Sequence, residues 1–366
     1  MTRRPHLRPY DRELHDHLRP GVVPEPVACP TGWYFARFSK HLRRGHVVPV
    51  TYMSREYALF RTDSGQVGLI DSQCCHMGAH LARGGYVRKE SLTCGFHAWE
   101  FDVTGRCVKV PGGCRIPPRA AQRSLPVVEH GGCVWFWHGP GPAEPFTDLD
   151  HAQDRRQYLH LPGEVHVCHS DLLTVSEHVT DVAHWPCAHG APGPMTYVPL
   201  RDEGRHFSFV IQPVDANVTR VQRFRPYARV TMASPTLALV TAQSQPQPDS
   251  KPPMLTVIAA VSPVRPGLTI AMWGVVVRKL GPDWLLWPVN RLWAAFLRRV
   301  VRRNAASDVD VLRWRRPVPK DLWSAADGPS VRAYRRFYRR NLPPEGEQPE
   351  GEGGTADRLR QDPPPP

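Results

Sequence analysis

Hydrophobic positions alternate with polar ones, or form short runs, through the middle of the chain. Runs at residues 57–60 and 67–70 flank Asp63-Ser64-Gly65, and this pattern predicts a β-hairpin. An aromatic run at residues 133–137 predicts another strand, and a Pro/Gly-rich linker follows it at residues 139–145. Further alternating stretches predict an antiparallel sheet from residues 207–211, 236–241, 255–261 and 269–277.

Helical periodicity marks the remaining segments of regular structure. It extends over residues 284–314, and a shorter helix is expected to carry Asp181 and His184. We therefore expect an α+β chain with an all-β domain first and an antiparallel sheet with long helices after it. The predicted divisions are an N-terminal arm at 1–28, the all-β domain at 29–142, a second domain at 143–342 and a disordered, acidic, Gly/Pro-rich tail at 343–366.

Composition narrows the class of protein. A chain of 366 residues can bury the cores of two domains. Its longest apolar stretch, residues 268–277, is much shorter than the roughly 20 residues that cross a bilayer, so no membrane span is expected. The first residues are basic but lack the apolar centre of a signal peptide. Nine cysteines, four of them in the candidate metal site below, indicate a reducing compartment, and we expect a cytoplasmic protein.

Two short segments offer paired metal donors. Cys74-Cys75-His76 is followed, after seventeen intervening residues, by Cys94-Gly95-Phe96-His97. Two thiolates and two imidazoles can hold a [2Fe-2S] cluster in which two His replace two Cys on one iron. The same four donors also suit Zn²⁺, and the spacing alone does not decide between the two.

The residues around these donors carry a family resemblance. The segments CCHMGAHL and CGFHAWEFDVTGRC resemble the two cluster-binding loops of Rieske proteins, and the resemblance implies a [2Fe-2S] cluster on Cys74, His76, Cys94 and His97. Respiratory-chain Rieske proteins join these loops by a disulfide, whose positions here are Ala79 and Phe96. The chain is therefore more similar to the Rieske domains of non-haem iron oxygenases.

The remaining cysteines need another explanation. Cys75, Cys107 and Cys114 are expected to be small buried side chains rather than ligands. The resemblance covers about residues 30–342 and looks closest to the group that contains aminopyrrolnitrin oxygenase, 3-ketosteroid hydroxylases and cholesterol desaturases. It implies a helix-grip-like second domain with a mononuclear iron.

That iron needs two His and one carboxylate with open positions beside them. In SEHVTDVAHWPCAHG, Asp181, His184 and His189 match the family pattern Asp-x-x-His-x4-His, which implies that the two His bind Fe(II). Positions five apart on an unbroken helix point about 140° apart, so we expect Pro186 to break the helix after His184. His178 stands where several relatives carry Asn.

The third ligand should be an Asp on the long downstream helix. On the helical repeat Asp308 shares its face with Val301 and Leu312, whereas Asp310 lies with Arg299 and Arg303. The family's spacing of apolar residues after this Asp also favours Asp308. Asp310 remains the alternative, because a register error of two residues would exchange them.

The resemblance also implies partners and an assembly. Electrons would come from NAD(P)H through a reductase or a ferredoxin, and O₂ and a small organic substrate would meet at the iron. In a head-to-tail homotrimer, Asp181 would join an iron-ligating His to a cluster-ligating His of the neighbouring subunit. The shorter electron path would give Asp181 a catalytic role.

The net charge of +13 bears on those partners. Much of it lies in eleven arginines of the last expected helical segments: Arg298, Arg299, Arg302, Arg303, Arg313, Arg315, Arg316, Arg335, Arg336, Arg339 and Arg340. Such faces are usually only solvated, but this one would also suit an acidic ferredoxin. No nucleic-acid motif is present, so nucleic acid is not an expected partner.

The predicted function is oxidation, by monooxygenation, of a small organic or secondary-metabolite substrate. The alternative is a Rieske electron-transfer protein without its own catalytic iron, and a second metal site would distinguish the two.

Overall fold

The computed structural model describes residues 8–17, 28–191, 193–215, 227–243, 252–318 and 320–344. Most of the tail predicted to be disordered lies outside these residues. The expected N-terminal arm contains a helix, α1 (Pro9–His17), which the sequence did not predict. It is held by Asp11, whose carboxylate pairs with the buried guanidinium of Arg37 at 2.8 Å. This ion pair attaches the arm to the first strand.

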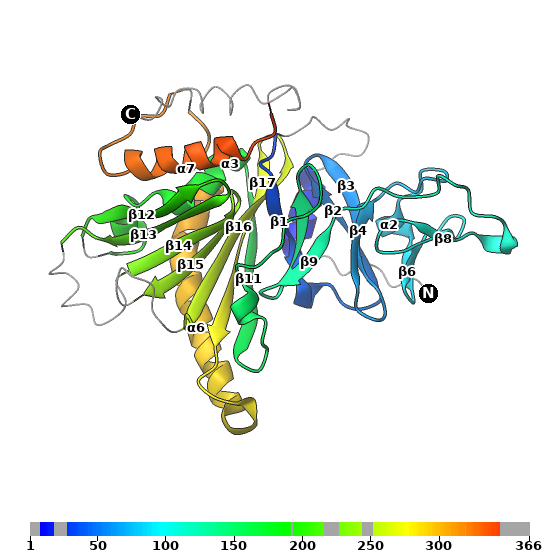
Figure 1. Ribbon diagram of the computed structural model, residues 1–366, viewed down its shortest axis with the longest axis horizontal. Helices are drawn as coiled ribbons and strands as arrows, with labels where there is room; N and C mark the ends of the chain where they lie inside the picture. The colour runs from blue at the N-terminus through cyan, green and yellow to red at the C-terminus, as the bar shows by residue number, and fades with distance from the viewer. Residues whose placement is uncertain are drawn as a thin grey trace.

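The first half of the chain forms three small antiparallel sheets (Figure 1). One contains β1 (Gly32–Phe38), β10 (Cys133–His138) and β9 (Val127–His130), and the second contains β2 (His46–Tyr52), β3 (Arg55–Arg61) and β4 (Val67–Asp71). The third has four short strands: β5 (Tyr86–Arg88), β6 (Ser91–Thr93), β7 (Glu100–Phe101) and β8 (Cys107–Lys109). The predicted hairpin around residues 63–65 is confirmed as β3 and β4.

The second half forms a seven-stranded antiparallel sheet. Its strands, in spatial order, are β11 (Tyr158–Cys168), β17 (Leu268–Arg278), β16 (Leu255–Arg265), β15 (Leu237–Gln243), β14 (Tyr227–Ser234), β13 (His206–Pro213) and β12 (Met195–Glu203). The four predicted stretches are confirmed within it. β11 was not predicted because Pro162-Gly163 is typical of a turn. The pairing of β11 with β17 shifts register between Pro162 and Glu164. Gly163 lies at this shift, where a Cβ atom would collide with the Trp273 ring.

Two helices pack against this sheet. α6 (Asp283–Leu312) confirms the predicted long helix, and its Ala294 and Val301 pack on Trp273 and Val275 of β17. In Figure 1 it crosses one face of the sheet and its first turns project beyond the sheet. α7 (Gly328–Arg340) buries Tyr334 and its neighbours at one end of the molecule. No helix among the described residues has the length and hydropathy needed to cross a bilayer.

Short helical turns complete the fold. The α-helical turns are α2 (Leu81–Gly84), α3 (Leu172–Ser176) and α4 (Trp185–Ala188), and the 3₁₀ turns are η1 (Ser39–His41), η2 (Pro111–Gly113), η3 (Asp150–Ala152) and η4 (Glu177–Thr180). Strand β1 also joins the two halves, because the carbonyl groups of Trp33 and Phe35 accept hydrogen bonds from Ser234 and Ser262 at 2.9 Å. The hydrophobic core is continuous there, so the division at residues 142 and 143 stays a prediction.

Candidate metal centres

The two donor loops of the first half have the same backbone frame. The Cys74 amide donates to the carbonyl of Ala79, and the Cys94 amide donates to that of Trp99, each five residues on. The amides of Gly78 and Ala98 return hydrogen bonds to the carbonyls of Cys74 and Cys94. Gly78 and Ala98 both have a positive φ, of 74° and 54°. An alanine rarely adopts a positive φ outside a tight loop. The sequence thus folds each donor pair locally, within six residues.

These loops bring the four predicted cluster donors together. Cys74 and Cys94 are buried and contact each other, while the rings of His76 and His97 lie 4.7 Å apart toward the outside. The Trp99 ring stacks on His76 at 4.4 Å and fixes its plane. Burial raises the pKa of Cys74 to about 11, so its thiolate needs a metal cation to form at neutral pH. Two inner thiols and two outer imidazoles fit the unequal irons of a Cys₂His₂ cluster.

The expectation for the other cysteines was only partly right. Cys107 is buried, but Cys75 and Cys114 are exposed. Cys75 is exposed because neighbouring residues in the tight loop point in different directions, and Cys74 takes the inward position. None of these three forms a disulfide.

A second donor set lies in the second half of the molecule. His184 and His189 approach within 3.1 Å through their Nε2 atoms. Asp308 of α6 places its Oδ1 atom 3.3 Å from Nε2 of His189 and 3.8 Å from Nε2 of His184. Two imidazoles and one carboxylate from the distant ends of this half therefore meet at one point.

The local fold around the two His differs from the prediction. Asp181 and His184 do not lie on one helix, because Asp181 is extended at the end of η4 and His184 precedes α4. Pro186 does not break a helix but lies in the first turn of α4, where its missing N–H costs no hydrogen bond. The one-turn helix carries His189 at its end, so that both imidazoles face the same side.

Of the two acids left open by the sequence, Asp308 joins the histidines. It is partly buried against them, whereas Asp310 is exposed on the outer side of α6. The helical-face argument thus selects the acid that the fold brings to the site. Its role as a ligand stays a prediction.

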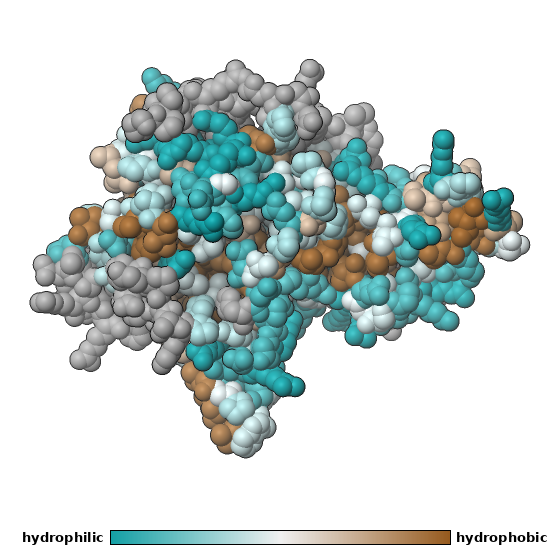
Figure 2. Space-filling view, in the orientation of Figure 1, coloured by the Kyte–Doolittle hydropathy of each residue, from teal (hydrophilic) through white to brown (hydrophobic). Residues whose placement is uncertain are grey.

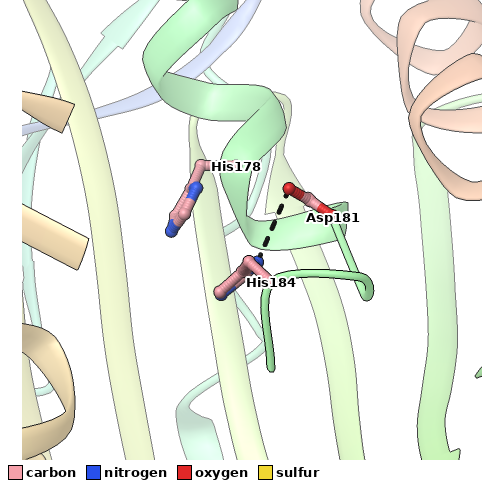
Figure 3. A group of neighbouring side chains, drawn as sticks. All are labelled: His178, Asp181 and His184. Atoms are coloured by element: carbon pink, nitrogen blue, oxygen red, sulfur yellow. Dashed lines mark ion pairs between the residues drawn. The ribbon is translucent and has the colours of Figure 1, made fainter. Parts of the chain in front are cut away.

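Asp181 lies behind the donor set. Its Oδ2 atom is 3.7 Å from Nδ1 of His184 (Figure 3), whereas Nε2 of the same ring is the atom near Asp308. Its Oδ1 atom accepts a hydrogen bond from the Ala183 amide. Burial raises the pKa of Asp181, but His184 and this amide outweigh it and hold the pKa below its usual value. An ionised carboxylate in this position orients the imidazole for a metal.

His178 is a fourth donor at the same point. Its ring stacks on that of His184 at 4.3 Å (Figure 3), and its Nε2 atom lies 3.3 Å from Oδ1 of Asp308. Neither of these two atoms has a hydrogen-bond partner among the described residues, although both are buried. A donor atom of His178 also lies within 4.8 Å of the Asp181 carboxylate. Burial also lowers the pKa of His189, which favours the neutral imidazole that binds metals. Converging donors without hydrogen-bond partners fit a cation.

Sequence reasoning missed the ion pairs that hold this site in place. Glu177 is 1% exposed, and it accepts hydrogen bonds from Arg315 at 2.9 Å and from the equally buried Arg335 at 2.8 Å. Arg335 also pairs with Asp321 at 2.7 Å. These contacts, which we call the Glu177 clamp, tie η4 to the segment that follows α6 and to α7. An acid directly before His178 was the only signal in the sequence.

The clamp also changes the interpretation of the eleven arginines. Most are engaged individually rather than forming one free surface: Arg302 pairs with Glu164, Arg313 with Glu13, and both Arg336 and Arg340 with Asp202. Arg299 and Arg303 are exposed on α6. The expected basic face is thus divided between internal ion pairs and a smaller charged surface.

A cavity of about 270 Å³ opens beside the second donor set. Its wall is formed by apolar side chains of the seven-stranded sheet and of α6, including Val230, Met232, Val257, Met272 and Val301. His178, His184, His189 and Asp308 form its polar end. An apolar molecule in this cavity would lie directly beside the converging donors.

Comparison with known proteins agrees with this geometry. The Rieske [2Fe-2S] domain family matches residues 32–119. The chain is 25% identical over 332 residues to a Rhodococcus rhodochrous protein named "Probable 3-ketosteroid-9-alpha-monooxygenase, oxygenase component", covering 87% of this chain and 80% of the relative. It is 34% identical over 161 residues to cholesterol 7-desaturase nvd 1 of Ciona intestinalis, covering 43% of this chain and 34% of that protein. The chain spans only 34% to 41% of the cholesterol 7-desaturases it matches.

Solved structures share the fold. NdmA of Pseudomonas putida CBB5 with caffeine superimposes with a TM-score of 0.61 at 17% identity, covering 84% of this chain and 89% of that one. Dicamba monooxygenase bound to dicamba gives a TM-score of 0.57 at 17% identity, covering 85% and 96%. Both alignments extend well beyond the first half of the molecule.

Proposed function

We propose that this chain, which carries a Rieske domain within the fold of the Rieske oxygenases, is a terminal oxygenase that uses O₂ and donor electrons to oxidise a small organic molecule. The observation that carries the proposal is the 2-His-1-carboxylate set at the polar end of an apolar cavity. An electron-transfer protein would need neither feature.

Each group has a distinct role in this proposal. Cys74, His76, Cys94 and His97 would hold the [2Fe-2S] cluster, and His184, His189 and Asp308 would hold Fe(II). When bound, the cluster supplies single electrons and the mononuclear iron supplies the O₂ chemistry. Asp181 keeps the His184 ring oriented, and the apolar wall excludes water from the substrate.

The cavity indicates the substrate class. Its volume of about 270 Å³ and its apolar wall fit a compact ring system with few polar groups. The name of the R. rhodochrous relative states a ketosteroid substrate and monooxygenation. We propose that this chain likewise monooxygenates an apolar molecule, such as a secondary metabolite.

The electron donor and the assembly belong to the same proposal. Electrons would come from NAD(P)H through a reductase or ferredoxin. In a homotrimer, the edge that carries the exposed His76, with Met77 and Phe96 at 65% and 63% exposure, would meet Asp181 of the next subunit. Nine cysteines, four of them in the proposed cluster site, favour a reducing compartment such as the bacterial cytoplasm.

Nitric oxide tests the proposal without knowledge of the substrate. Protein loaded anaerobically with Fe(II) should give the S = 3/2 EPR signal of a nitrosylated non-haem iron with an open position. Asp308→Ala should lose that signal, while Asp310→Ala, which removes an exposed acid from the same helix, should keep it. A wild-type protein without the signal, but with an intact cluster, would instead be an electron-transfer protein.

A further inference from the structure

The outward side of α6 changes chemistry halfway along the helix. On the helical repeat, Leu285, Leu292 and Phe296 point away from the sheet, opposite the buried Ala294 and Val301. They are 61%, 72% and 57% exposed, and Trp284 beside them is 85% exposed. Exposed apolar residues are common singly, but several in succession on one helix indicate a binding surface.

The next turns of the same outward side are basic. Arg299 and Arg303 are exposed, and the exposed Arg302 beside them pairs with Glu164 at 2.8 Å. Arg299 lies fifteen residues after Trp284, a distance of about 22 Å along an α-helix. The helix thus has an apolar end, followed by a collar of positive charge.

The position of this end in the molecule limits what it can bind. The first turns of α6 project beyond the sheet (Figure 1), and their apolar side chains form a continuous hydrophobic surface on the projection, next to hydrophilic residues (Figure 2). A flat or yielding partner fits such a convex projection.

We propose that this projection, which we call the α6 tip, docks on an anionic lipid bilayer. Trp and Leu side chains partition into the boundary between headgroups and acyl chains, and arginines beside them contact lipid phosphates. The tip would lie in one leaflet without crossing the bilayer. Trp284, Trp287 and Arg291 would lie at the interface.

Charge favours a bilayer over a second copy of this chain. A dimer formed through the α6 tips would bring two arginine collars together in chains of net charge +13. Anionic lipids complement the same collars. The charge of the α6 tip therefore favours binding to an anionic bilayer over binding to a second copy of this chain.

Docking would also serve the cavity. Val301, Ala305 and Asp308 of the same helix line it, so a bilayer held at the start of α6 would lie roughly 25 Å along the helix from an apolar binding site. A substrate dissolved in lipid would then be concentrated near the protein. This consequence rests on the proposed function, whereas the docking does not.

Vesicle flotation tests the docking on the full chain with its cluster. Wild-type protein should float with vesicles of phosphatidylglycerol and phosphatidylcholine at low salt, and bind much less to pure phosphatidylcholine. Leu292→Glu combined with Phe296→Glu should lower the bound fraction about tenfold. Leu322→Glu is the matched control, because Leu322 is 89% exposed away from the tip, and its binding should not change.

A second pair of substitutions tests the collar. Arg299→Glu combined with Arg303→Glu should remove the preference for anionic vesicles and most of the salt dependence. Light scattering without vesicles and circular dichroism should show that all variants keep the wild-type mass and fold. Absence of wild-type flotation on anionic vesicles would overturn the proposal. A smaller assembly in the Leu292/Phe296 variant, with unchanged flotation, would also overturn it and identify the tip as an interface between copies.

Discussion

The two candidate metal centres are built at very different ranges along the chain. The cluster loops fold within six residues each and rest on a small core that includes Phe60, Leu92 and Phe101. The mononuclear site joins residues 178–189 to Asp308, more than a hundred positions away, and borders the cavity beneath the large sheet. One centre depends on local turns, whereas the other depends on the whole second half of the fold.

The difference predicts how each centre fails. A local change in a loop should remove the cluster and leave the rest of the molecule intact. A change outside the donor set, in the Glu177 clamp or elsewhere on α6, should disturb the mononuclear site and leave the cluster intact.

The largest expected effect comes from Cys94→Ser. It removes one buried thiolate, so the protein should lose the visible colour and the EPR signal of the reduced cluster while it still binds one Fe(II). Cys75→Ser, one residue from a cluster donor but exposed, should keep the full signal. A full-intensity cluster signal in Cys94→Ser would exclude Cys94 as a ligand.

Asp181→Asn tests whether Asp181 carries electron transfer between the two centres. The amide keeps the size of the side chain but loses the charge that faces His184 Nδ1. Both metals and the homotrimer should persist, while stopped-flow reoxidation of the prereduced cluster by O₂ should slow at least about tenfold. Asp310→Asn is the control on an exposed acid. Wild-type reoxidation in Asp181→Asn would mean that Asp181 has no bridging role.

The Glu177 clamp gives the next effect. Glu177→Gln leaves the buried Arg335 without its full counter-charge, which typically costs about 3–5 kcal/mol of the free energy of unfolding. Denaturant unfolding should show this loss, and Fe(II) should bind more weakly while the cluster spectrum is unchanged. Glu90→Gln, on an exposed loop where Glu90 accepts hydrogen bonds from Ser64, should cost much less stability and leave Fe(II) binding unchanged. Equal weakening of both centres would contradict their separate construction.

The smallest effect concerns pH. Burial lowers the pKa of His138 to about 4, whereas an unfolded chain has a His pKa near 6.5. The unfolded state therefore binds more protons between these values, and stability that is complete above about pH 6.5 declines as the pH falls toward 4. We expect a loss of about 1–2 kcal/mol from this group between pH 7 and 5. His138→Phe should flatten the pH dependence of the denaturant midpoint; an unchanged slope would contradict the assignment to His138.

The two centres also differ in what the sequence could predict. The cluster donors were predictable because short loop spacing carries their geometry, and Asp308 could be selected over Asp310 by its helical face. The one-turn helix at Pro186, the approach of His178 and the clamp on Glu177 were not predicted. They depend on how η4, α6 and α7 pack, which no local pattern encodes.

The central claim is that one chain builds two separate iron centres, and metal analysis tests it most directly. Wild-type protein reconstituted anaerobically with iron and sulfide, then freed of loosely bound metal, should contain about three iron atoms and about two acid-labile sulfides per chain. Two irons with two sulfides would contradict the claim and indicate a cluster alone.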